Sequence, residues 1–136
     1  MIYWPKKPGM QSKVTYEYAV VRLVPKVERE EFLNIGVILF SKRKRFLGIK
    51  YQVNEAKVKA FSEEIDVDMV NRYLQAWEAV CIGGRQGGKI GELDLASRFR
   101  WLVAARSTII QSSPTHPGLC DDPEAILEKL FQRYVL

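Results

Sequence analysis

Side chains that can do chemistry gather in one short stretch of the sequence, residues 106–118, which reads RSTIIQSSPTHPG. The stretch contains the single histidine of the chain. If residues 107–111 form a strand, Arg106, Ser107, Gln111 and His116 converge at one end of a sheet. His116 would then act as a general base on Ser107 or on a water, while Arg106 and Gln111 would bind a phosphate or a carboxylate.

The same stretch also has a structural interpretation. SSPTHPG is rich in residues whose side chains bond to local backbone in turns, and the Ser–His pair has no nucleophile elbow and no assigned acid. We favour a core strand that leaves through a turn and presents Arg106, Gln111 and His116 to a partner or ligand. Arg98, in the nearby SRFRWL, would extend this cationic surface or lie over its aromatic neighbours.

A basic run is the second candidate site. Residues 1–50 hold eleven basic and four acidic side chains, a net charge of +7, whereas residues 51–136 carry −2. The positive charge is concentrated in Lys6, Lys7, Lys13 and the run Lys42, Arg43, Lys44 and Arg45. Contacts with phosphates would make this run a nucleic-acid-binding surface with a steep salt dependence. Alternatively, it is the exposed tip of a hairpin, since no aromatic pattern for base stacking accompanies it.

Other motifs indicate no metal and no cofactor. Residues 83–91 are rich in glycine but lack GxxxxGK[ST], so we expect a connector between helices. Cys81, Cys120 and one histidine are too few and too far apart for a zinc site. Two cysteines outside a disulfide pattern favour reduced thiols in a cytoplasmic protein. No apolar run approaches the roughly 20 residues that cross a bilayer, so we expect no membrane partner.

Hydrophobic periodicity predicts the elements that position these residues. We expect strands over 14–25, 35–40, 46–53 and 107–111, and helices over 54–64, 66–84, 94–102 and 121–136. Residues 42–45 turn between two of the strands. Three strands, then helices, then a strand and a helix predict an α+β fold: a mainly antiparallel sheet of about four strands with helices packed on one face.

This order predicts one domain over residues 14–136, preceded by an N-terminal arm over residues 1–13. From Ala19 onward the first strand is apolar on both of its faces, so its second half should be covered on both sides. An exposed sheet edge would also permit a homodimer.

Two stretches resemble a known family: YAVVRLVPKVEREEFLNIGVILF (18–40) and RFRWLVAARSTIIQSSPTHPGLCDDPEAILEKLFQRYV (98–135). They are similar to the bacterial family catalogued as domain of unknown function 3037, over nearly the whole chain after the arm. The resemblance implies no activity and no site residues. Members are often encoded beside a HipA-like kinase, which implies an accessory or regulatory subunit in a kinase-like, toxin–antitoxin pair.

Three functions therefore stay open at this stage. The first is a non-enzymatic module that binds a partner protein, for which the resemblance implies a HipA-like kinase. The second is a small hydrolase or nuclease acting on a phosphate-containing substrate through His116 and Ser107, which requires these side chains to lie within hydrogen-bonding reach. The third is a nucleic-acid-binding protein, which requires one continuous basic stripe.

Overall fold

A central antiparallel sheet organises the chain, of which the computed structural model describes residues 13–136. Its first three strands, β1 (Val14–Leu23), β2 (Leu33–Ser41) and β3 (Phe46–Tyr51), form a meander. The short η1 (Val27–Arg29) lies between β1 and β2, and residues 42–45 form the predicted exposed turn. The predicted α+β class is confirmed. The predicted arm, apart from Lys13, lies outside the described residues.

The edge of the sheet beside β1 is one interrupted strand. Both β4 (Ile110–Ser112) and β5 (His116–Cys120) pair with β1, β4 near its end and β5 near its start. The sequence predicted a strand over 107–111 and then a turn, and this prediction is wrong for residues 116–120, which rejoin the sheet. The sheet thus has five strands instead of about four.

Ser113 carries the edge across its interruption. The backbone N–H of Ser113 donates to the carbonyl of Val20 at 2.8 Å, and its Oγ accepts from the N–H of Val20 at 2.8 Å. A side-chain oxygen thus takes the place of a backbone carbonyl in the ladder. Pro114 and Pro117 are tolerated here because an edge strand does not need every N–H for pairing.

The longer helices begin where the sequence predicts. These are α1 (Glu55–Phe61), α2 (Val67–Ile82), α4 (Leu95–Val103) and α5 (Pro123–Tyr134). In each, an Asn or Asp side chain accepts a hydrogen bond from a backbone N–H of the first turn. The glycine-rich connector folds into two short turns, η2 (Arg85–Gly87) and α3 (Gly88–Gly91). Residues 13–136 contain no helix of the length and hydrophobicity that a bilayer requires.

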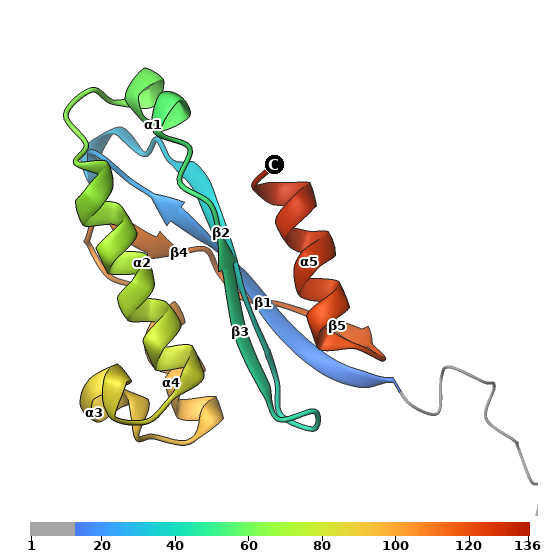
Figure 1. The fold of residues 1–136 in the computed structure, drawn as a ribbon. Coiled ribbons are helices and arrows are strands. Elements are labelled where there is room, and N and C mark those ends of the chain that lie inside the picture. Colours follow the sequence, from blue (N-terminus) through green and yellow to red (C-terminus); the bar gives the residue numbers. More distant parts are fainter. Residues whose placement is uncertain (1–12) are drawn as a thin grey trace, which may run out of the picture.

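The sheet lies between two helical layers (Figure 1). Helices α1, α2 and α4 cover one face, and α5 covers the other. The prediction that helices pack on one face is therefore wrong for α5. The reason lies in β2, where Ile38 and Phe40 belong to the core under α2 and α4 while Val37 and Leu39 belong to the core under α5. A strand that is apolar on both faces requires a cover on each.

A β-bulge in β2 decides which side chains reach the α5 side. Val21 pairs with Gly36 and Arg22 pairs with Asn34, so Ile35 is the extra residue. The bulge keeps Ile35 in the core under α2 and turns Asn34 toward α5. A side chain at Gly36 would be crowded, because a Cβ there would lie 3.0 Å from the carbonyl oxygen of Lys50.

Candidate functional site

The structure separates the residues that the sequence grouped over 106–118. Arg106 contacts Trp77 and Trp101 on the α2–α4 side of the sheet. His116 lies on the opposite side, beside the ring of Tyr18 in the layer under α5. Ser107 is exposed and precedes β4.

The strand register separates the start of β4 from His116. Ile110 pairs with Leu23 and His116 pairs with Tyr18, five positions away along β1. This separation corresponds to roughly 17 Å. Ser107 lies three positions before Ile110, in the segment that enters β4. The structure does not bring Arg106, Ser107 and His116 into one constellation.

Arg98 has a structural role. Its guanidinium donates to the carbonyl oxygens of Val80 at 2.9 Å, Cys81 at 2.8 Å and Leu93 at 3.0 Å. Val80 and Cys81 belong to the last turn of α2, whose carbonyls have no partner within the helix. Arg98 therefore ties the end of α2 to the start of α4, and these bonds use three of its five N–H donors.

An apolar groove opens between α2 and α4, and we name it the indole groove. Tyr73 and Trp77 lie one turn apart on α2, with ring centroids 6.5 Å apart. Trp101 faces them from the last turn of α4. The cavity measures about 360 Å³ and is lined by Tyr73, Ala76, Trp77, Val80, Gln86, Gly87, Gly88 and Trp101. Its wall is aromatic and aliphatic, with the α2–α3 connector at one rim.

Arg106 lies against the two indole rings of the groove. Its guanidinium carbon lies 4.5 Å from the ring centroid of Trp101 and 5.6 Å from that of Trp77. An Nη2 proton of Arg106 is donated to the carbonyl oxygen of Trp101. Trp77 is 2% exposed, whereas Trp101 is 41% exposed. One indole is thus anchored in the core, and the other, held beneath an arginine, faces solvent.

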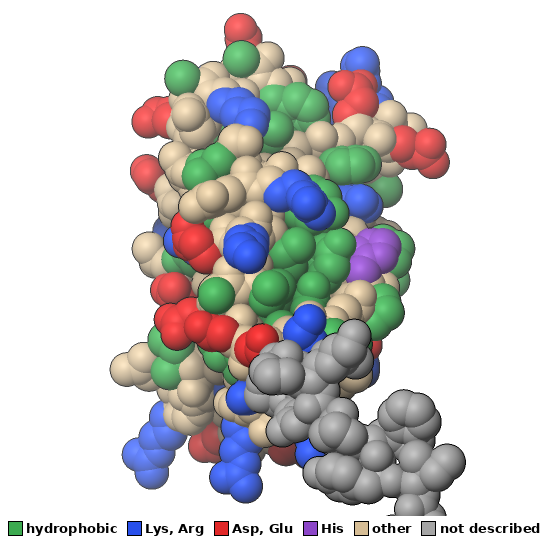
Figure 2. Space-filling view, turned by 90° about the vertical axis from the view of Figure 1, so that its right-hand side faces the viewer, with side chains coloured by type: hydrophobic (Ala, Val, Ile, Leu, Met, Phe, Trp, Pro, Cys, Tyr) green, Lys and Arg blue, Asp and Glu red, His purple; other side chains and the backbone are tan. Residues whose placement is uncertain are grey.

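On the α5 side, His116 belongs to an aromatic cluster. Its ring centroid lies 5.3 Å from that of Tyr18, which lies 6.1 Å from that of Tyr134. The two tyrosine hydroxyls are 3.2 Å apart. This hydrogen bond, more than burial, raises the pKa of Tyr18 to about 12 and lowers the pKa of Tyr134. Figure 2 shows the histidine at the margin of a hydrophobic surface.

Gln111 also lies on this face, and it points to a residue that the sequence analysis did not single out. Gln111 pairs in register with Arg22, and its Nε2 donates to the carbonyl of Thr108 at 2.8 Å. The guanidinium carbon of Arg22 lies 4.0 Å from the ring centroid of Phe32. Arg22 lies in the second half of β1, which is otherwise apolar. The sign of it in the sequence is a charged residue between two apolar residues of a strand, Val21 and Leu23.

The basic run is a solvated hairpin tip. Lys42, Arg43, Lys44 and Arg45 are all exposed in the turn between β2 and β3. Lys13 is exposed before β1, and Lys6 and Lys7 lie outside the described residues. Figure 2 shows basic side chains interspersed with acidic ones on the α5 side, with no continuous basic stripe among the described residues drawn there.

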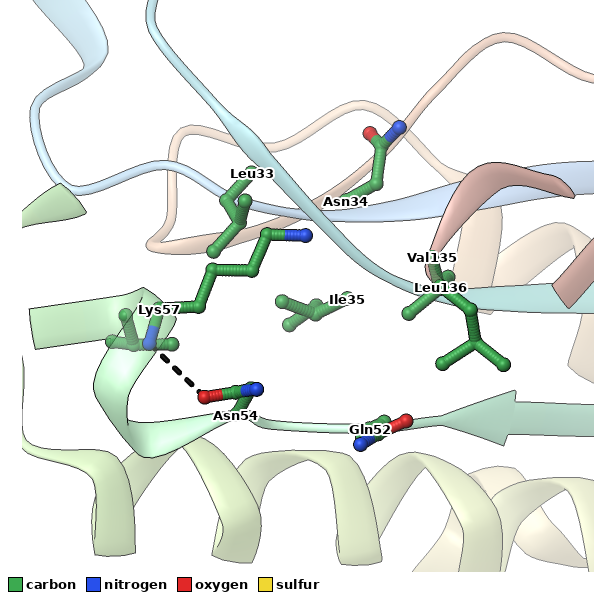
Figure 3. A pocket seen from close by; sticks show the side chains of 9 residues that line it. Leu33, Asn34, Ile35, Gln52, Asn54, Lys57, Val135 and Leu136 are labelled. Atoms are coloured by element: carbon green, nitrogen blue, oxygen red, sulfur yellow. Dashed lines mark hydrogen bonds between the residues drawn. The ribbon is translucent and has the colours of Figure 1, made fainter. Parts of the chain in front are cut away.

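A second pocket of about 250 Å³ lies between β2, α1 and the residues after α5 (Figure 3). Leu33, Ile35 and Val135 make its wall mostly apolar. Asn54, at its rim, uses its side-chain oxygen to accept from the N–H of Lys57 at 3.0 Å, which caps α1. Within residues 13–136 there is no group of three or more His, Cys, Asp or Glu side chains placed to hold a metal ion.

These features define a small α+β protein with an antiparallel sheet between helical layers and with aromatic and arginine side chains exposed on both sides. The chain belongs to the family described as Protein of unknown function (DUF3037), whose model matches residues 18–135. Searches of curated proteins and of solved structures found no match.

The sequence contained a signal for the indole groove that the periodicity analysis did not use. Leu95, Phe99 and Leu102 follow helical spacing, and Phe99 and Leu102 are fully buried. Trp101 lies off that buried stripe. A tryptophan on the solvent side of an amphipathic helix is the recognisable mark of such a surface.

Proposed function

We propose that this protein is a non-enzymatic accessory module that binds a partner protein through the indole groove. The observation that carries the proposal is the exposed Trp101, held under Arg106 beside a cavity of about 360 Å³. Tryptophan, tyrosine and arginine supply most of the binding energy in protein interfaces, typically from well-packed pockets. Tryptophan and tyrosine line this groove, and Arg106 lies against its indole rings.

The groove defines the chemistry of the partner segment. Its aromatic and aliphatic wall accepts an apolar side chain. Arg106 forms no ion pair with any residue from 13 to 136, so its charge is available to a carboxylate. The fitting segment has an apolar anchor next to an acidic residue. Following the resemblance, we assign this segment to a HipA-like kinase, with the present chain as its regulatory subunit.

The two other functions have less support. A hydrolase or nuclease needs His116 near Ser107 or Arg106, and Arg106 and His116 occupy opposite sides of the sheet. Nucleic-acid binding needs a continuous basic stripe, and the described basic residues of the hairpin tip are not part of one on the face in Figure 2. Binding of a partner protein through the indole groove requires neither of these arrangements.

The test is the affinity for the purified HipA-like kinase, measured by titration calorimetry. We expect Trp101→Ala to weaken binding by at least about tenfold, because it removes an interface anchor. The matched control is Leu119→Ala, which removes a side chain that is 62% exposed on β5. It should leave affinity unchanged. Equal affinity of Trp101→Ala and wild type would exclude the groove, and no binding by wild type would exclude the kinase.

A further inference from the structure

The pocket between β2, α1 and the residues after α5 has a buried apolar floor (Figure 3). Ile35, Val58 and Val135, which line it, are 1%, 0% and 7% exposed. The Nδ2 group of Asn34 donates to the carbonyl oxygen of Tyr134 at 3.2 Å, which holds the end of α5 against β2. Core packing and this hydrogen bond therefore fix the three elements that form the recess.

The rim of the same pocket is polar and open to solvent. Gln52, Asn54 and Lys57 line it and are all exposed. Figure 3 shows the side chain of Lys57 extending from α1 across the pocket. Within residues 13–136 its ammonium forms no ion pair, because the ion pairs there involve other side chains. An unpaired positive charge thus lies over an apolar recess, which we name the Lys57 pocket.

The two amide side chains add hydrogen-bond donors to this rim. The Oδ1 atom of Asn54 accepts the backbone N–H of Lys57 at 3.0 Å, and its Nδ2 makes no hydrogen bond to the described chain. The backbone N–H of Gln52 donates to the carbonyl oxygen of Ile35 at 2.9 Å, and its side-chain amide is likewise unused within residues 13–136. None of the nine described residues that line the pocket is acidic. The rim therefore favours an anion that accepts hydrogen bonds.

We propose that the Lys57 pocket binds an aliphatic monocarboxylate of about six carbons. The aliphatic chain contacts the buried floor, and the carboxylate stays at the rim, where it accepts hydrogen bonds from the Lys57 ammonium and the side-chain amides of Gln52 and Asn54. A water-sized group takes about 30 Å³, so a cavity of about 250 Å³ holds roughly eight non-hydrogen atoms. Hexanoate has this size.

This site is independent of the proposed function. The Lys57 pocket and the indole groove share no residue. Loss of kinase binding in Trp101→Ala therefore says nothing about the Lys57 pocket, and failure of hexanoate to bind says nothing about the kinase.

The experiment is an NMR titration at constant ionic strength that follows the methyl signals of Ile35 and Val58. The probes are hexanoate, butanoate and the uncharged hexanamide. We expect a saturable shift with hexanoate. Butanoate should bind about fifteenfold more weakly, because each of the two missing methylenes contributes about a factor of four when buried. Hexanamide should bind about fivefold more weakly, because it lacks the charge that pairs with the ammonium at this solvated rim.

Two lysine variants separate the role of Lys57 from general charge effects. Lys57→Met keeps most of the aliphatic stem and removes the charge, so it should weaken hexanoate binding by about fivefold and leave hexanamide binding unchanged. Lys129→Met, the same change at an exposed position of α5 outside the pocket, should bind hexanoate as wild type does.

The contrary outcomes are equally clear. No saturable shift of the two methyl signals with hexanoate would overturn the proposal, and so would butanoate binding as tightly as hexanoate. Hexanamide binding as tightly as hexanoate would show that the pocket does not select a carboxylate. Wild-type affinity of Lys57→Met for hexanoate would overturn the role of the ammonium.

Discussion

Tyr18 and Tyr134 show how a single hydrogen bond makes two identical side chains chemically different. Their shared hydrogen bond raises the pKa of Tyr18 to about 12 and lowers the pKa of Tyr134. A phenol that retains its proton more firmly in the folded state stabilises the fold below its ordinary pKa of 10.0. That contribution is lost as the pH rises from 10 toward 12.

We expect Tyr18→Phe to raise the pKa of Tyr134, because the hydrogen bond that stabilises its phenolate is removed. The measurement is an NMR pH titration of the Tyr134 ring signals. Tyr73→Phe is the matched control, since Tyr73 lies on the opposite side of the sheet, in the indole groove. An unchanged pKa of Tyr134 in Tyr18→Phe would show that the two hydroxyls do not share a hydrogen bond in solution.

At the level of single residues, the sequence drew attention to reactive side chains but did not show which residues would surround them. Arg98 and Arg106 are separated by eight positions, yet one ties together two helix ends and the other stacks on indoles. These roles depend on carbonyls and rings brought near by folding. Arg22 was missed because its meaning depends on a bulge in a different strand, at Ile35.

The interrupted edge strand depends on one hydroxyl. Ser113 is 3% exposed, and its Oγ accepts the N–H of Val20 across the break between β4 and β5. We expect Ser113→Ala to lower the free energy of unfolding by about 1–3 kcal/mol, because it leaves a buried N–H unpaired. Urea denaturation measures the effect. Ser107→Ala, at an exposed position, should change stability by less than about 0.5 kcal/mol. Equal stability of the two variants would contradict this role of Ser113.

Local chemistry explains which elements the sequence predicted correctly. Each helix start was recognisable because an N-cap bonds to a backbone group two or three residues away. The return of residues 116–120 to the sheet was not recognisable, because their partner strand begins about a hundred positions earlier, at Val14. Pro117 and Gly118 within that segment also match a turn as well as they match an edge strand.

At the scale of the whole molecule, Cys81 reports on opening of the core. It is 6% exposed in the core between the sheet and α2, and burial raises the pKa of its thiol to about 12. At pH 8 only roughly one thiol in ten thousand would be ionised in the folded state. The thiol of Cys81 is therefore protected from reagents both by its burial and by its low degree of ionisation.

In a Cys120→Ser background, we expect Cys81 to react with a thiol reagent at pH 8 only through unfolding. Its labelling rate should rise with urea in parallel with the unfolded fraction measured by circular dichroism. Prompt stoichiometric labelling of the native protein without urea would contradict the burial of this thiol.

The layered architecture was predictable only in part. The apolar second half of β1 indicated cover on both faces, but the sequence order did not show that α5 supplies the second cover. Amphipathic periodicity says that a helix buries one stripe, and it does not say against which face. The choice is made by the two apolar faces of β2, which only the assembled sheet displays.

The position of α5 in the chain has a consequence for protein synthesis. While the ribosome is still adding residues 123–134, the face of β2 that contains Val37 and Leu39 has no cover. A chain that stalls at this point displays an apolar strand surface next to an incomplete edge. Such surfaces recruit chaperones and promote aggregation. Quality control of this protein should therefore depend on α5. When α5 packs, it covers the apolar face of β2 and removes the surface that promotes aggregation.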